Sequence, residues 1–147
     1  MIKRIVKLLL VIFFMSVIFL FSNEKSVKST KRSDGVISFV HKIININKSI
    51  TKIEIVIVRK SAHFFLYFCL GLSYISLLSE FTDKNLLLYS LLFVFIYACF
   101  DEVHQLFIGG RSFQVFDIII DTGGGLLSFY IYYLLRRRKY EQEKAIS

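Results

Sequence analysis

The chain has 147 residues, of which 55% are hydrophobic and 16% aromatic, and it contains no proline. It carries 19 Lys and Arg residues against 11 Asp and Glu residues, for a net charge of +8, and its mean hydropathy is +0.60. This composition excludes an ordinary soluble domain, because the apolar residues form long runs rather than amphipathic stripes. The class that remains is a small polytopic membrane protein, with a single domain over residues 1–147.

Four apolar segments predict membrane-spanning helices, at residues 5–21, 61–79, 86–107 and 115–135. Crossing a bilayer takes about 20 residues at about 1.5 Å each, a length that the last three segments reach and the first approaches. The first segment follows three basic residues, as in a secretory signal peptide, but no small residues of a cleavage site follow it. We therefore expect a retained first helix and an all-α fold, an antiparallel bundle of four transmembrane helices.

The segment between the first two spans divides into two parts. Residues 22–32 are polar and rich in Ser and Lys, which predicts a linker. Residues 36–50 carry apolar side chains at helical spacing with lysines between them, and they are too polar to span. They predict one extracytoplasmic amphipathic helix, which lies either in the membrane interface or against the bundle. The β-branched run at residues 53–58 indicates no particular conformation.

The basic residues at the two ends of the chain predict its orientation. Lys3, Arg4 and Lys7 flank the first span, and the cluster at residues 136–139 follows the last one. Basic residues next to spans favour the cytoplasmic side. The segment at residues 22–60 is also basic, but it is longer and less closely bound to the span ends. We therefore expect cytoplasmic N- and C-termini.

With this topology, the polar residues near three span ends meet at the extracytoplasmic end of the bundle. The predicted site residues are Arg59, Lys60, His63, Tyr67, Asp101, Glu102, His104, Gln105, Arg111, Asp117 and Asp121. Helical spacing places His63 and Tyr67 on one face of the second span, and Asp117 and Asp121 on one stripe of the last. Ionisable groups at the edge of a bilayer cost several kcal/mol unless they are paired or hydrated, which indicates a functional site.

Several interpretations of this cluster remain open. In one, the three bases neutralise the four carboxylates and lock the helix ends together. In another, His63 or His104 beside a carboxylate provides acid–base or nucleophilic chemistry. A divalent metal site has less support, because the HExxH spacing is absent, and no metal is assigned. Binding of an anionic or amphiphilic ligand by Arg59, Lys60 and Arg111 is favoured, since guanidinium groups match phosphate and carboxylate.

Two stretches resemble the VanZ-like family of small integral membrane proteins: RKSAHFFLYFCLGL at residues 59–72 and YACFDEVHQLFIGGRSFQVFDIIIDTGGGLLS at residues 97–128. The segment FSNEKS at residues 21–26 is similar to that family's Ser-rich motif after the first span. One departure is Leu66, where many members carry Glu. The resemblance implies a multi-pass helical bundle in the bacterial cell membrane.

The resemblance implies a function only in outline. The family's namesake is associated with low-level resistance to teicoplanin, so the implied role is glycopeptide resistance or envelope homeostasis. The expected partners are membrane lipids and a lipid-linked or glycopeptide ligand, with no nucleic acid and no cofactor. The alternative is a membrane-embedded enzyme that acts on a lipid or a lipid-linked cell-wall substrate. Its catalytic candidates are His63, Asp101, Glu102 and His104.

Overall fold

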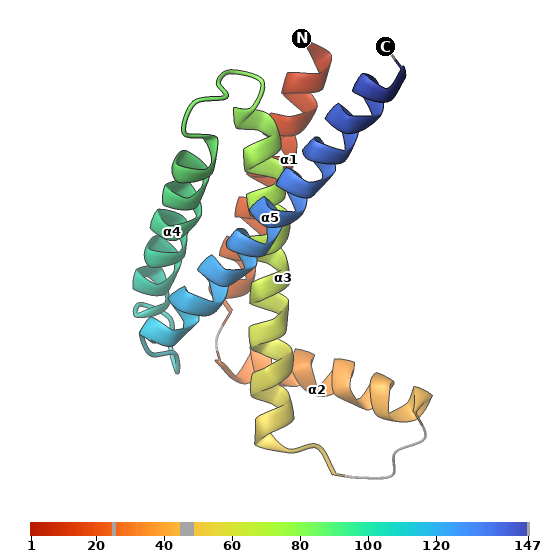
Figure 1. The fold of residues 1–147 in the computed structure, drawn as a ribbon. Coiled ribbons are helices and arrows are strands. Elements are labelled where there is room, and N and C mark those ends of the chain that lie inside the picture. The colour runs from red at the N-terminus through yellow and green to blue at the C-terminus, as the bar shows by residue number, and fades with distance from the viewer. Residues whose placement is uncertain (25, 45–48, 147) are drawn as a thin grey trace.

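The computed structural model of the protein describes residues 1–24, 26–44 and 49–146, and every regular element in them is an α-helix. The helices, in chain order, are α1 (Ile2–Ser22), α2 (Ser26–Ile43), α3 (Lys52–Leu78), α4 (Leu86–Gln105) and α5 (Val115–Ile146). Four of them run up and down, and α2 crosses one end of the bundle (Figure 1). The predicted all-α fold with one additional helix is confirmed.

Four helices are long and apolar enough to cross a membrane by length and composition, over Ile2–Ser22, Lys52–Leu78, Leu86–Gln105 and Val115–Arg138. They contain the four predicted segments, except that α3 ends at Leu78 rather than at residue 79 and α4 ends at Gln105 rather than at residue 107. The second span begins at Lys52 rather than at residue 61, because a capping box starts it there. Thr51 Oγ1 accepts from the Glu54 amide at 3.2 Å, and the Glu54 carboxylate accepts from the Thr51 amide at 2.7 Å. The β-branched run at residues 53–58 is therefore helical.

The linker predicted at residues 22–32 is wrong for most of its length, because α2 begins at Ser26. Glu24 forms ion pairs with Lys28 and Arg32, which lie one and two turns further on, and these pairs stabilise the start of the helix. Ser29 and Ser33 are buried, with 8% and 5% of their surface exposed. Small polar side chains thus form the packed side of α2, which composition alone does not distinguish from a linker.

The amphipathic helix predicted at residues 36–50 ends earlier than expected. The α2 helix ends at Ile43, residues 49 and 50 are not helical, and residues 45–48 lie outside the described part of the chain. His41 Nε2 lies 3.1 Å from Glu54 Oε1 and connects α2 to α3. Several apolar side chains of α2 stay exposed: Val36, Phe39, Val40 and Ile43. Exposed apolar side chains on a helix across the end of the bundle favour a position in the membrane interface.

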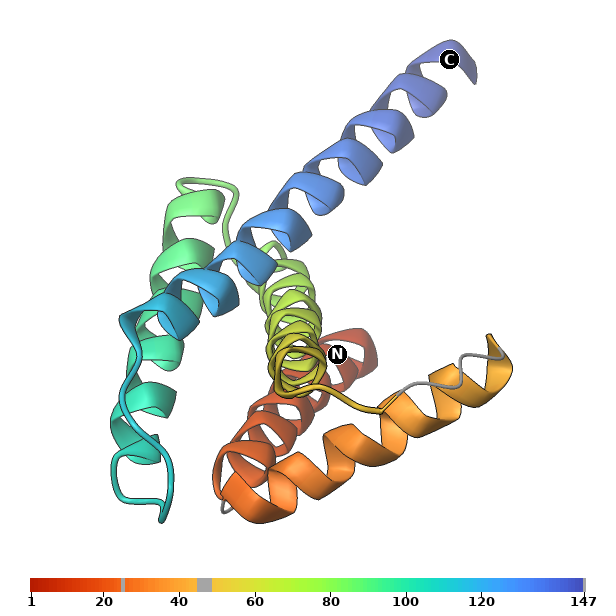
Figure 2. The ribbon, with the colours of Figure 1, turned by 90° about the horizontal axis from the view of Figure 1, so that it is seen from below.

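Helix α3 occupies the centre of the bundle. It contacts all the other helices, and a view along it shows α1 and α2 on one side and α4 and α5 on the other (Figure 2). The core is narrow, with Ile18, Tyr67, Leu70 and Val94 fully buried. Many large apolar side chains on the outer faces remain exposed, as expected for helices that face lipid.

Helices α3 and α5 approach each other closely at Gly124. A Cβ atom at this position would lie 2.3 Å from the backbone carbonyl oxygen of Phe64, so only glycine permits the contact. His63 precedes Phe64 on α3, and Asp121 lies almost one turn before Gly124 on α5. The close crossing therefore sets the separation of two predicted site residues.

Candidate functional site

Most of the predicted site residues lie together at one end of the bundle, the end that α2 crosses. Both chain termini lie at the opposite end (Figure 1). A pocket opens among the ends of α3, α4 and α5, with a volume of about 10 Å³, which is roughly what one water molecule or one ion needs. Its lining residues are Arg59, Lys60, His63, Gln105, Arg111, Asp117, Ile120 and Asp121.

A second, larger pocket adjoins the first and shares three of its residues, Arg59, His63 and Arg111. Its volume is about 80 Å³. The other walls come from α1, α2 and α3, and they are both apolar and polar: Phe21, Ser29, Arg32, Ser33, Val36, Val58 and Ala62. This larger pocket therefore places two arginine side chains beside an apolar wall, which suits a ligand with an anionic head and an apolar tail.

Arg111 is positioned by the turn between α4 and α5. Gly110 adopts a φ of 82°, a left-handed conformation that glycine reaches without steric cost, and the chain reverses there. The Arg111 guanidinium then extends to the end of α1, where Nη2 donates to the Phe21 carbonyl at 3.2 Å and Nε donates to the Glu24 carbonyl at 3.1 Å. A cation at the C-terminal end of a helix is favourable, because the unsatisfied carbonyls there carry partial negative charge.

A chain of hydrogen bonds leads from Arg111 into the bundle. Arg111 Nη1 donates to Gln105 Oε1 at 2.8 Å, and Gln105 Nε2 donates to Asp101 Oδ2 at 3.0 Å. Ser22 Oγ donates to the same Asp101 oxygen at 2.8 Å. Asp101 is only 2% exposed, so these bonds fix a buried carboxylate from three segments of the chain.

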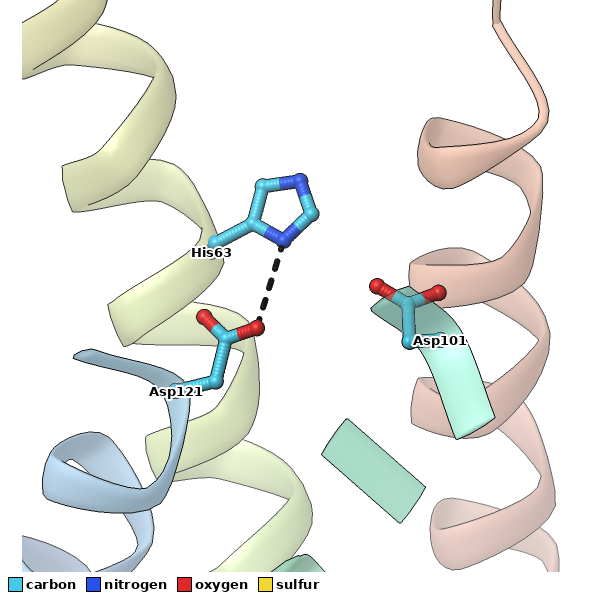
Figure 3. A group of neighbouring side chains, drawn as sticks. All are labelled: His63, Asp101 and Asp121. Carbon is cyan, nitrogen blue, oxygen red and sulfur yellow. Dashed lines mark ion pairs between the residues drawn. The ribbon is translucent and has the colours of Figure 1, made fainter. Parts of the chain in front are cut away.

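His63, Asp101 and Asp121 form the innermost part of the site (Figure 3). His63 Nδ1 and Asp121 Oδ2 lie 3.8 Å apart, which is close for two charges but too long for a hydrogen bond. Asp121 is 1% exposed, and within the described residues neither of its carboxylate oxygens has a hydrogen-bond partner. One donor atom of each of the three side chains lies within 4.8 Å of the other two.

The two remaining carboxylates have local partners. Asp117 forms an ion pair with Lys60, which joins the start of α5 to α3. Glu102 accepts a hydrogen bond from the Gln114 backbone amide at 2.9 Å through Oε2, so it holds the connection between α4 and α5 in place. Neutralisation of the acids by the three bases, one interpretation of the sequence, therefore holds in part: it accounts directly for Asp117.

Comparison with known proteins assigns the chain to a family. The family model described as VanZ/LLP1 matches residues 7–136, which is most of the chain and includes part of every span. The chain belongs to the VanZ/LLP1 family. No curated protein and no solved structure gives a significant match. The resemblance to VanZ-like proteins that the sequence motifs indicated is thereby confirmed.

Four predicted site residues of this VanZ/LLP1 protein line neither pocket: Tyr67, Asp101, Glu102 and His104. The His104 ring stacks on Phe19 of α1 at a centroid distance of 4.7 Å, and His104 lines neither pocket. Tyr67 is fully buried one turn below His63, and its hydroxyl has no hydrogen-bond partner among the described residues. Leu66, where many VanZ-like sequences carry Glu, packs against the apolar core.

Sequence reasoning missed several residues that build the site. Ser22 bonds to Asp101, the Glu24 carbonyl accepts from Arg111, and the Gln114 amide bonds to Glu102. Ser22 and Glu24 belong to the segment at residues 21–26 that carried the family resemblance, so a signal for the segment was present. Gln114 contributes only its backbone, and no side-chain pattern reveals such a contact.

Proposed function

We propose that this VanZ/LLP1 protein binds the anionic headgroup of a lipid or lipid-linked envelope component at the extracytoplasmic face of a bacterial membrane. The observation that carries the proposal is the state of Arg59. Its guanidinium lines both pockets, and in the described part of the chain it makes no hydrogen bond and no ion pair. An unpaired cation at a membrane boundary indicates a binding role, because a purely structural group there is normally paired.

Arg111 supports the proposal from the facing side of the larger pocket. All three of its hydrogen bonds go to uncharged oxygens, those of Gln105, Phe21 and Glu24. Burial lowers the pKa of Arg111, and repulsion from the nearby Arg59 charge lowers it further. An anion between the two guanidinium groups would relieve this repulsion and supply an acceptor for Arg59 and a negative charge for Arg111. Phosphate and carboxylate groups fit this geometry, because they accept two parallel N–H bonds from one guanidinium.

The walls of the larger pocket favour an amphiphilic ligand. Val36, Val58 and Ala62 give it an apolar side, and Val36 is itself exposed on α2. A headgroup held between Arg59 and Arg111 would leave its acyl or prenyl chain free to enter the surrounding bilayer. Binding of a lipid-linked cell-wall precursor in this pocket would alter envelope assembly. It would also reduce the access of teicoplanin-type glycopeptides to that precursor. Such binding would connect the pocket to the role that the family resemblance implies.

A second candidate is a membrane-embedded enzyme that acts on the same class of ligand, and the position of His63 favours it. This imidazole lines both pockets and lies beside Asp121, a carboxylate able to orient it as a general base. The two candidates differ in what His63→Gln does. An enzyme loses turnover and keeps ligand affinity, whereas a binding protein shows no turnover to lose.

The proposal is tested by native mass spectrometry of the full-length protein in detergent, with undecaprenyl pyrophosphate and phosphatidylglycerol as probes. Loss of a charge-assisted hydrogen bond costs about 1.5–3 kcal/mol, so Arg59→Gln should weaken binding at least about tenfold. Arg111→Lys should also weaken it, because Lys lacks the planar fork. The two probes separate recognition of a lipid-linked pyrophosphate from recognition of a phospholipid headgroup.

The matched control is Arg4→Gln, which removes the same charge at the opposite end of the bundle, where Arg4 pairs with Glu80. It should leave the affinity within about twofold of wild type, since interactions of exposed pairs contribute about 1 kcal/mol or less. Equal weakening by Arg4→Gln and Arg59→Gln would reduce the effect to general attraction between charges. Unchanged binding by Arg59→Gln would refute the proposed site.

A further inference from the structure

We infer that His63, Asp101 and Asp121 form a binding site for one divalent transition-metal ion, such as Zn²⁺ or Mn²⁺, beside the small pocket, which His63 and Asp121 line. The three side chains come from α3, α4 and α5 and gather around one space (Figure 3). The sequence gave a metal site in this cluster little support, because these residues are 38 and 20 positions apart rather than in a local motif. The inference is independent of the anion site, which requires only the guanidinium groups at the mouth.

The bases around the pocket form no ion pair with its two innermost carboxylates. Lys60 pairs with Asp117 and Arg32 pairs with Glu24, while Arg111 bonds only to uncharged oxygens. Arg59 makes no ion pair in the described part of the chain. The almost completely buried carboxylates of Asp101 and Asp121, like that of Glu102, therefore make no ion pair with Lys or Arg there. A buried carboxylate without a partner costs several kcal/mol. One divalent cation would neutralise both carboxylates.

Asp121 gives the most direct support for a bound cation. Only 1% of the residue is exposed, it faces His63 and Asp101, and neither of its oxygens has a hydrogen-bond donor among the described residues. The nearest basic atom is His63 Nδ1, at 3.8 Å. A carboxylate and an imidazole held just beyond hydrogen-bond distance leave a space that a metal ion can occupy between them.

Asp101 is oriented as a metal ligand would be. Ser22 and Gln105 both donate to Oδ2, so the other oxygen, Oδ1, is left to face a cation. Hydrogen bonds of this kind fix the direction of a ligand carboxylate and commonly strengthen metal affinity. Arg111 in turn holds Gln105, so the orientation of Asp101 depends on a bonded chain that reaches the protein surface.

The dimensions suit a small ion after a modest closure. Metal–ligand bonds of about 2.0–2.2 Å place tetrahedral donors roughly 3.4 Å apart, so the donor atoms, now within 4.8 Å, must approach by side-chain rotation. The pocket volume of about 10 Å³ holds one ion.

The donor set selects the class of metal. Carboxylate oxygens alone suit Mg²⁺ and Ca²⁺, whereas an imidazole nitrogen favours zinc, iron and related ions. One nitrogen and two carboxylates therefore favour a first-row divalent ion that accepts both donor types. Three protein ligands also leave at least one coordination position for water or for a ligand oxygen from the pocket.

The test uses the full-length protein in detergent, stripped with a chelator, dialysed against Zn²⁺ or Mn²⁺ and measured by inductively coupled plasma mass spectrometry. Wild type should retain about one ion per chain. His63→Gln and Asp121→Asn should each raise the Kd at least about tenfold, because each removes one of three ligands. Asp83→Asn, the matched control, changes an exposed aspartate that pairs with Arg136, and it should bind like wild type.

Absence of metal from wild type, or equal binding by wild type and Asp121→Asn, would overturn the site. If the variants fail to elute as folded protein in gel filtration, X-ray absorption of the metal-loaded wild type decides instead. A first shell of one imidazole nitrogen and oxygens supports the assignment, and a shell with sulfur or without nitrogen excludes it. Because Arg59→Gln should keep the metal and lose the anionic ligand, failure of one site is distinguishable from failure of the other.

Discussion

Replacing Gly124 by alanine is the most direct test of how helix packing positions the site. The new Cβ atom would lie 2.3 Å from the Phe64 carbonyl oxygen, 3.1 Å from its carbonyl carbon and 3.2 Å from the Phe68 nitrogen. All three are backbone atoms of α3, so no side-chain rotation relieves the clash. The two helices must move apart by roughly 1 Å to restore ordinary van der Waals contact.

The expected cost follows from that displacement. Overpacking typically costs about 1–3 kcal/mol, and a backbone clash belongs at the upper end of that range. Alanine regains up to about 1 kcal/mol over glycine in a helix, which leaves a net destabilisation of about 2 kcal/mol. Because His63 and Asp121 adjoin the crossing, we also expect Gly124→Ala to weaken metal binding.

Gly123→Ala is the matched control on the same helix. Its Cβ would meet only the Phe64 side chain, at 3.7 Å, which is an ordinary contact, so its stability should equal or slightly exceed that of wild type. Reversible unfolding in a titration with sodium dodecyl sulfate measures both free energies of unfolding. Equal stability of Gly124→Ala and Gly123→Ala would show that α3 and α5 do not cross as closely as described.

Two further predictions concern orientation and pH. With cytoplasmic termini, the thiol of Ser112→Cys should react with a membrane-impermeant reagent in intact cells and that of Gln142→Cys should not; the reverse pattern would place both pockets in the cytoplasm. The hydrogen bond from Lys7 lowers the pKa of Glu80 below its ordinary value of 4.5, and the positive charge of Lys7 lowers it further. The ionised pair therefore stabilises the fold above that pH and is lost as the pH falls through the lowered pKa. The difference in melting temperature between wild type and Glu80→Gln should accordingly shrink below about pH 4.5, and a difference that is constant with pH would contradict the pairing.

The sequence alone was sufficient to predict the number of spans and the end of the bundle where the polar residues gather. Long apolar runs leave a chain few alternatives to membrane-spanning helices, because the bilayer core demands that every backbone group be satisfied within the segment. Short connections then force antiparallel neighbours, so Arg59, Asp101 and Arg111 must lie at the same end. The connection between α4 and α5 contains Gly110, whose positive φ permits the tight reversal there.

The tertiary structure decided which of these residues meet. Ser22 and Asp101 are 79 positions apart, and Arg111 reaches the Phe21 carbonyl across 90 positions. Such pairings depend on the rotation and crossing of whole helices, which are set by contacts such as that between Gly124 and Phe64 rather than by local spacing. The same packing directs His104 toward Phe19 and gathers His63 with two buried aspartates, although the two histidines follow equally plausible patterns along the sequence.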